Sequence, residues 1–186
     1  MNAAFGVMNS GRTDMNCPCP CYNIRMKKII LACCLTFACL AAHANPASPV
    51  LKQQVAAFID EWHDDAANAR LAYFDKMAED GVYIGTDKTE NWKREEFRAW
   101  AKKYFDRKQA WSFKAVSRNI YASPDGSFIW FDEILDTPNM GPCMASGVIR
   151  KTAKGFEIVH YQLSMAVPNE VGGKVTALIK AHEAKQ

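Results

Sequence analysis

Residues 127–170 are the part of the sequence that most constrains the fold, because they predict three consecutive β-strands. The segment is rich in aromatic and β-branched side chains, which favour strands. The strands are expected at residues 127–136, 144–152 and 156–166. Pro138 and Gly141 lie in the first break, where proline has no N–H to donate to a strand ladder, and Gly155 lies in the second. Short turns between neighbouring strands predict an antiparallel meander, and one face of such a sheet needs a cover.

Side chains alternate between two faces along the third of these strands. One face begins with Phe156 and Ile158 and then becomes polar, with His160, Gln162 and Ser164. A face of this kind is typical of a strand that runs from a core into a cavity. The members of the other face are Glu157, Val159, Tyr161, Leu163 and Met165. This face is apolar after its first residue and needs a cover, so we predict a homodimer formed through it.

The residues before the meander predict the helices that cover it. Ser48 and Pro49 are typical of the start of a helix. The apolar stripe of this helix contains Leu51, Val55, Phe58, Ile59 and Trp62. Asn68 predicts the cap of a second, shorter helix that ends at Gly81. The remaining elements are a strand at 82–85, a polar loop at 86–91, a helix at 92–108, a strand at 111–122 and a C-terminal helix at 170–186. The order of helices and strands predicts an α+β fold.

Residues 26–44 have the three parts of a secretory signal peptide. Met26 is followed by two lysines, an apolar run covers 29–42, and the small residues Ala42 and Ala44 mark a cleavage site. The apolar run is too short to span a bilayer, which takes about 20 residues. We therefore expect translation to start at Met26, residues 1–25 to be a non-native leader, and residues 45–186 to form a single periplasmic or secreted domain with no membrane contact after cleavage.

The composition of residues 45–186 argues against a nucleic-acid partner, an internal disulfide and a metal site. Acidic and basic side chains are equal in number there, so we expect no nucleic-acid partner. Cys143 is the one cysteine in this range, which excludes an internal disulfide, and we expect its thiol to be buried. His63, His160 and His182 are scattered along the chain and do not have the spacing of a metal site, so no metal is expected.

Several short motifs carry a resemblance to a known family. They are Tyr-Ile-Gly-Thr-Asp at 83–87 with Glu90 and Trp92, Trp-Phe-Asp-Glu at 130–133, Cys143 with Ser146 and Gly147, His-Tyr-Gln-Leu-Ser at 160–164, and Pro-Asn-Glu at 168–170. Through these motifs, residues 50–170 resemble the secreted SnoaL-like domains of the nuclear transport factor 2-like superfamily. The resemblance implies a cone-shaped α+β fold, or cystatin-like barrel, in which a curved antiparallel sheet wraps on N-terminal helices around a pocket. Such domains are often dimeric.

The resemblance leaves the function open, because its relatives include polyketide cyclases, ketosteroid isomerases, epoxide hydrolases and non-catalytic association domains. Asp132 and His160 are the candidate catalytic residues. A carboxylate beside Trp130 and Ile134 in an apolar pocket would have a raised pKa and could transfer protons. The alternatives are that Asp132 and Glu133 hold a loop or a dimer contact, and that His160 is a hydrogen-bonded core residue.

The candidate pocket residues are Tyr83, Trp92, Trp100, Trp130, Gln162 and Ser164. Large rings with one polar atom suit the wall of a pocket for a flat apolar ligand, although they suit a core equally well. Two functions are therefore compatible with the sequence. One is a cofactor-independent enzyme of the isomerase, cyclase or hydratase type that acts on a small hydrophobic substrate by general acid–base chemistry. The other is a ligand-binding or dimeric association module without turnover.

Overall fold

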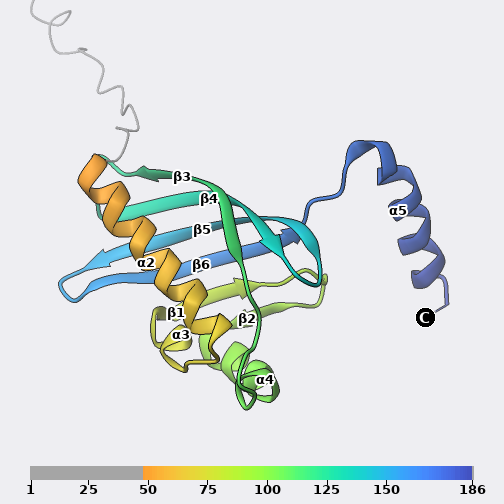
Figure 1. Ribbon diagram of the computed structural model, residues 1–186, viewed down its shortest axis with the longest axis horizontal. Helices are drawn as coiled ribbons and strands as arrows, with labels where there is room; N and C mark the ends of the chain where they lie inside the picture. The colour runs from red at the N-terminus through yellow and green to blue at the C-terminus, as the bar shows by residue number, and fades with distance from the viewer. Residues whose placement is uncertain (1–47, 186) are drawn as a thin grey trace, which may run out of the picture. The chain divides into compact units, whose positions relative to one another are not determined.

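The computed structural model describes residues 48–185 (Figure 1), so the leader predicted at 1–25 and the signal peptide predicted at 26–44 lie outside the described residues. The helices are α2 (Pro49–Ala67), α3 (Ala72–Asp75), α4 (Arg94–Phe105) and α5 (Asn169–Glu183). The strands are β1 (Met77–Ile84), β2 (Asn91–Lys93), β3 (Lys114–Ala122), β4 (Phe128–Thr137), β5 (Gly141–Thr152) and β6 (Gly155–Met165). None of the described helices is long and apolar enough to cross a membrane.

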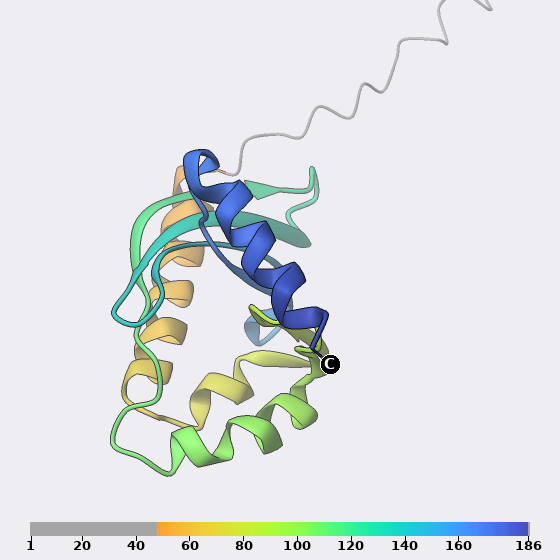
Figure 2. The ribbon, with the colours of Figure 1, turned by 90° about the vertical axis from the view of Figure 1, so that its right-hand side faces the viewer.

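The six strands form one curved, open sheet in the order β2-β1-β6-β5-β4-β3. Strands β3 to β6 are the predicted antiparallel meander, and β2 pairs antiparallel with β1. The pair β1–β6 is parallel and joins the β1–β2 hairpin to the last strand of the meander. Figure 2 shows the sheet bending over α2, with α3 and α4 below it. The predicted α+β class, with a curved sheet wrapped on N-terminal helices, is confirmed.

The first helix forms as predicted. Ser48 caps α2, because its Oγ accepts a hydrogen bond from the backbone N–H of Leu51 at 3.2 Å. Its apolar stripe turns toward the sheet and buries Val55, Ile59 and Trp62 completely. Trp62 Nε1 donates to the backbone carbonyl of Tyr73 at 2.9 Å, so this large ring enters the core without an unsatisfied donor.

The second helix is much shorter than predicted. It ends at Asp75, and Met77 already begins β1. Gly81 is a strand residue and not a helix cap. A Cβ at Gly81 would lie 2.8 Å from the carbonyl oxygen of Ala78 and 2.9 Å from that of Ile158. The glycine is therefore required by close backbone approach across the β1–β6 pair. The short strand β2 takes the last residue of the loop predicted at 86–91 and the first two residues of the helix predicted at 92–108, which begins only at Arg94.

A β-bulge in β6 reverses the two faces predicted for this strand. Val148 pairs with His160 and the next residue, Ile149, pairs with Ile158, so Val159 is an extra residue on β6. Beyond the bulge, Tyr161 and Leu163 face the core and are 0% and 4% exposed. The predicted apolar patch is therefore not on the outer face, and the predicted homodimer would have to use other residues.

The core lies between α2, α3, α4 and the concave face of the sheet. Its largest fully buried side chains are Trp62, Tyr73, Tyr161, Phe74, Phe97 and Phe131. The rings of Trp62 and Tyr73 stack with centroids 4.7 Å apart. Cys143 is also fully buried, as expected, and its Sγ lies 3.9 Å from Thr137 Oγ1. The interior is thus largely aromatic where α3 and α4 cover the sheet.

Candidate functional site

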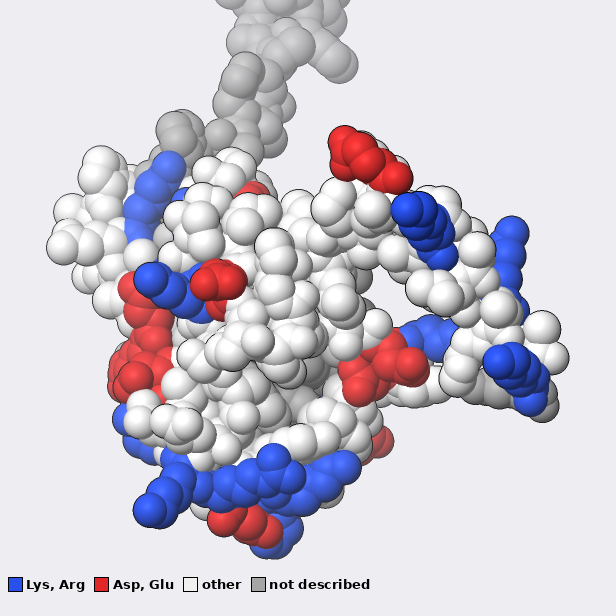
Figure 3. Space-filling view, turned by 45° about the vertical axis from the view of Figure 1, so that its right-hand side comes forward, with Lys and Arg blue, Asp and Glu red and all other residues white. Residues whose placement is uncertain are grey.

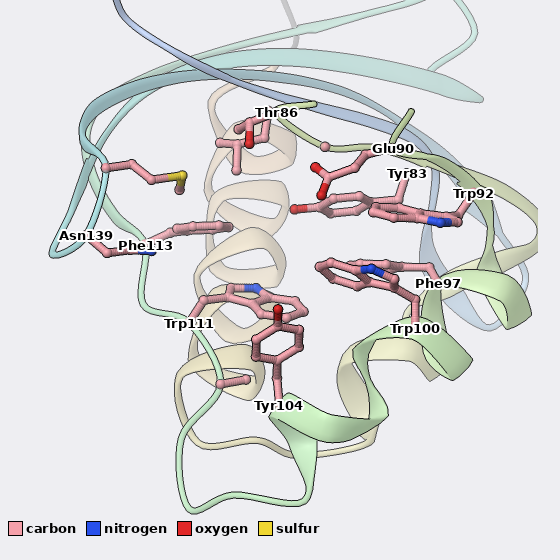
Figure 4. A pocket seen from close by; sticks show the side chains of 14 residues that line it. Tyr83, Thr86, Glu90, Trp92, Phe97, Trp100, Tyr104, Trp111, Phe113 and Asn139 are labelled. Carbon is pink, nitrogen blue, oxygen red and sulfur yellow. The ribbon is translucent and has the colours of Figure 1, made fainter. Parts of the chain in front are cut away.

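A pocket of about 210 Å³ opens at the end of the cone where α4 approaches the sheet (Figure 4). Its lining comes from β1, β2 and the turn between them, from α4, from the segment before β3, from the β4–β5 turn and from β6. The lining residues are Tyr83, Gly85, Thr86, Glu90, Trp92, Phe97, Trp100, Tyr104, Ala110, Trp111, Phe113, Asn139, Met140 and Leu163. A second hollow of about 490 Å³ adjoins it and shares Ala110, Trp111 and Asn139.

Local structure brings the aromatic rings together. Tyr83 and Trp92 are cross-strand partners of the β1–β2 hairpin. Phe97 and Trp100 lie three residues apart on α4, so they share one face of the helix. The Tyr83 and Phe97 rings stack at 3.9 Å between centroids, and the Trp92 and Trp100 rings lie 4.6 Å apart. The pocket therefore has a wall of rings fixed by a hairpin and a helix.

The turn between β1 and β2 places one carboxylate at this wall. The backbone N–H of Gly85 donates to the Glu90 carbonyl at 2.9 Å, and Glu90 Oε2 accepts from the backbone N–H of Asp87 at 3.2 Å. A Cβ at Gly85 would lie 2.2 Å from Glu90 Oε2, so the glycine makes room for the carboxylate to fold back over the turn. Figure 4 shows the Glu90 carboxylate and the Tyr83 hydroxyl directed into the cavity.

Burial keeps the tyrosine hydroxyls near the pocket protonated. It raises the pKa of Tyr83, and the negative charge of Glu90 raises it further. Burial likewise raises the pKa of Tyr73 and Tyr161 well above the usual range. At neutral pH these hydroxyls are therefore hydrogen-bond donors and not phenolates.

A buried acid–base network lies behind the pocket wall. His63 Nε2 on α2 lies 2.7 Å from Glu133 Oε1 on β4, and Arg118 Nε on β3 donates to Glu133 Oε2 at 2.8 Å. Arg118 also donates to Asp60 Oδ1 at 2.8 Å and to the Ala56 carbonyl at 3.2 Å. Burial raises the pKa of the Glu133 carboxyl, but the hydrogen bond from His63 and the charges of His63 and Arg118 outweigh burial and hold it below the usual range.

Several buried polar atoms around this network have no hydrogen-bond partner among the described residues. They include His63 Nδ1 and Tyr161 Oη. Buried polar groups are normally paired, so atoms of this kind mark places where water or a ligand group completes the structure. Phe113 and Tyr83 link them to the pocket. The Phe113 ring meets the His63 ring edge-on at 5.6 Å, and the Tyr83 and Tyr161 rings lie 5.3 Å apart.

The structure brings three of the predicted site residues together and separates the others from them. Tyr83, Trp92 and Trp100 are among the residues that line the pocket. The other predicted residues face the opposite side of the sheet: Asp132, His160, Trp130, Gln162 and Ser164.

The outward residues have partners of their own on that side. Asp132 Oδ1 accepts a hydrogen bond from Asn119 Nδ2 at 2.8 Å, and Trp130 stacks on Tyr121 with centroids 5.8 Å apart. Strand β5 lies between Asp132 on β4 and His160 on β6. The structure therefore does not bring Asp132 and His160 into the pocket as a catalytic pair.

Two physical reasons explain this placement. Strand alternation turns Glu133, and not Asp132, toward the interior. The sequence carried this signal, because Glu133 shares its strand face with Ile129, Phe131 and Leu135, the more apolar of the two faces. For His160 the bulge at Val159 reverses the expected direction, and nothing in the sequence of β6 marks that bulge.

Sequence reasoning also missed His63, Arg118 and Glu90. His63 lies next to Trp62 at the end of the apolar stripe of α2, so its burial could have been predicted. Its contact with Glu133, 70 residues away in the sequence, could not. Within residues 48–185, no group of three or more His, Cys, Asp or Glu side chains is placed to hold a metal ion.

Comparison with models of known protein families shows to which family the chain belongs. The model of the SnoaL-like domain matches residues 55–168, more than half of the chain. The chain belongs to the SnoaL-like domain family. No curated protein matches this SnoaL-like domain in sequence.

Solved structures agree with the fold of the SnoaL-like domain. An NTF2-like protein of unknown function from Pseudomonas putida is 12% identical with a TM-score of 0.56, covering 67% of this chain and 92% of that one. A cystatin-like protein of unknown function from Nostoc punctiforme is 14% identical with a TM-score of 0.54, covering 64% and 93%. A proposed ketosteroid isomerase from Parabacteroides distasonis is 13% identical with a TM-score of 0.53, covering 68% and 95%. These likenesses establish the nuclear transport factor 2-like fold.

Proposed function

We propose that this SnoaL-like domain is a secreted protein that binds a small hydrophobic molecule in the pocket between β1, β2 and α4. The observation that supports this most is the lining itself. Seven of its side chains are aromatic: Tyr83, Trp92, Phe97, Trp100, Tyr104, Trp111 and Phe113. Ligand sites are concave, mainly apolar, and supplied with a few directed polar groups. Tyr83, Glu90, Thr86 and Asn139 are the polar groups of this pocket.

Two tryptophans of nearly equal exposure offer a matched test. Trp100 lines the pocket and is 36% exposed, whereas Trp130 lies on the outer face of the sheet and is 38% exposed. We expect a thermal-shift screen of small alicyclic and aromatic compounds to find stabilising ligands. Trp100→Ala should abolish the shift, because it removes one side of the wall, and Trp130→Ala should keep it. Equal loss in both variants, or no stabilising compound, would contradict the proposal.

A second candidate function is general acid–base catalysis, favoured by the geometry of His63. Glu133 holds the Nε2 side of the imidazole at 2.7 Å, and Nδ1 is buried without a partner. When such an imidazole is neutral and its Nε2–H is donated to the carboxylate, its free Nδ1 can accept a proton. The protonated hydroxyls of Tyr83 and Tyr161 could donate to a substrate oxygen on which negative charge develops. Phe113 stands between His63 and the pocket, so the substrate would have to reach past its ring.

The catalytic candidate is tested with His63→Gln, which keeps a polar side chain of similar length. For a compound that the wild-type protein converts, the variant should lose turnover by about 100-fold or more and retain binding. A wild-type protein that binds compounds and converts none would leave the non-catalytic binding module as the function.

A further inference from the structure

The described residues line the pocket with one negatively charged side chain and with no positively charged one. Among the lining residues, all of which belong to the described part of the chain, Glu90 is the one side chain with a formal charge at neutral pH. Glu90 Oε2 accepts from the backbone N–H of Asp87. The pocket therefore presents negative charge on an apolar wall, which disfavours an anionic ligand and attracts a cation.

The aromatic faces add to this attraction. A ring carries negative potential on its face, so a cation within about 6 Å of a centroid is stabilised, most strongly by tryptophan. Trp92, Trp100 and Trp111 approach the cavity from different elements, with Tyr83 and Tyr104 beside them. Several of these rings stack on one another, and together with the carboxylate they form an apolar, negatively charged wall of the kind that suits an organic cation.

The rings of this wall already attract cations on the surface of the domain. Lys103 Nζ lies 5.8 Å from the centroid of Trp100 and 5.0 Å from that of Tyr104, and Arg107 Cζ lies 5.2 Å from that of Tyr104. Figure 3 shows cationic side chains gathered along the lower edge of the domain, which is the side of α4. None of these lysines or arginines is a lining residue of the pocket.

The lining also favours a quaternary over a primary ammonium. A primary ammonium has three N–H donors, and burying them without acceptors is costly. Apart from the tyrosine hydroxyls, the side-chain acceptors of the lining belong to Glu90, Thr86 and Asn139, which lie in the β1–β2 and β4–β5 turns. A quaternary ammonium has no N–H to satisfy, and its methyl groups are apolar.

We propose that the pocket binds a small organic cation of the quaternary ammonium class, with the rings around its methyl groups and Glu90 as counter-ion. This inference rests on the proposed small-molecule function and names the chemical class of the ligand.

The test compares choline with its neutral isostere 3,3-dimethyl-1-butanol, in which carbon replaces the charged nitrogen. Titration calorimetry on the full domain should give an affinity for choline at least about tenfold higher, because one or more cation–π contacts and an ion pair are lost with the charge. Equal affinities, or binding of library compounds without binding of choline, would overturn the inference and leave the proposed function intact. Failure of choline, the isostere and the whole compound library would overturn both.

Charge-neutralising variants separate the role of Glu90 from an effect on folding. Glu90→Gln should weaken choline binding about tenfold and leave the affinity for the isostere unchanged. Glu79→Gln is the matched control, because its side chain is exposed on β1 outside the pocket, and it should change neither affinity. An unchanged choline affinity in Glu90→Gln, with a melting temperature close to that of the wild type, would also overturn the inference.

Discussion

At the scale of single residues, the stability of the domain depends on which of two adjacent carboxylates, Asp132 or Glu133, faces the interior. Glu133 is buried between His63 and Arg118, and its two oxygens are each bound by one of them. Asp132 faces the other side, where it accepts a hydrogen bond from Asn119. A buried charge is tolerated only when it is paired and hydrogen-bonded. Removal of one of the three interior residues should therefore destabilise the burial of the other two.

Glu133→Gln should destabilise the domain by about 3 kcal/mol, because it removes the buried counter-charge of Arg118 and leaves only the exposed carboxylate of Asp60 as its ion-pair partner. Urea denaturation at neutral pH measures this. Glu79→Gln, which changes an exposed glutamate in the same way, should change stability by less than about 0.5 kcal/mol. Similar small effects in both variants would show that the interior pair contributes nothing to stability.

The same carboxylate predicts a pH dependence. The folded state lowers the pKa of Glu133, so its contribution to stability is complete above the ordinary carboxyl pKa and is lost as the pH falls through the lower folded-state pKa. Wild-type stability should therefore fall through this acid range. Glu133→Gln should lack that component, so its deficit relative to the wild type narrows as the pH is lowered. A constant deficit across the acid range would contradict the assignment.

At the scale of elements, the sequence predicted the four strands from β3 to β6, the helices α2 and α4, and their order. These elements have strong hydrophobic periodicity or clear turn residues. It did not predict β2, the early end of α3 or the bulge at Val159, because each depends on how a strand pairs with its neighbour and not on the hydrophobic pattern of its own residues. The bulge matters most, since one extra residue exchanges the faces of β6.

The packing inside the sheet predicts the effect of one small substitution. A Cβ at Gly147 on β5 would lie 2.6 Å from Phe131 Cε1 and 2.9 Å from the His160 carbonyl oxygen. Gly147→Ala should therefore cost about 2 kcal/mol in urea denaturation. Gly173→Ala is the control, because a Cβ there meets nothing within 4 Å and the residue lies in α5; it should be neutral or slightly stabilising. Equal costs at both glycines would contradict the described packing.

At the scale of the whole molecule, the outer face of the sheet carries partly exposed apolar side chains. Tyr121, Trp130 and Met144 belong to neighbouring strands there. The homodimer predicted from the sequence stays a prediction, and this is the surface we expect it to use. Light scattering at micromolar concentration should give a dimer mass, and Met144→Lys should shift it toward the monomer, because a buried unpaired charge opposes association. A monomer mass for the wild-type domain would contradict the prediction.

Export is a separate expectation for the whole chain. If 26–44 is a signal peptide, the mature protein begins at Asn45. Mass spectrometry of the exported protein should find this N-terminus. A mature protein that retains residues 1–25 would contradict both the start at Met26 and the cleavage after Ala44.

The sequence predicted the fold class but only a small part of the candidate site. Of its six candidate pocket residues, Tyr83, Trp92 and Trp100 are among the 14 that line the pocket, and they were chosen because large rings with one polar atom suit a wall. The interior contact of His63 with Glu133 joins α2 to β4 across the cone, and no local pattern encodes such a contact. For this reason the chemistry of the interior became visible only in three dimensions.

Occupation of the pocket is tested most directly by fluorine NMR on protein labelled with 5-fluorotryptophan. The chain has 5 tryptophans, so each resonance can be assigned with single Trp→Phe variants. On titration with a compound that raises the melting temperature, the resonances of Trp92, Trp100 and Trp111 should shift, because these rings line the pocket. The resonance of Trp130, on the outer face, should stay in place. A shift of Trp130 alone, with the three pocket resonances unchanged, would show that the ligand binds elsewhere.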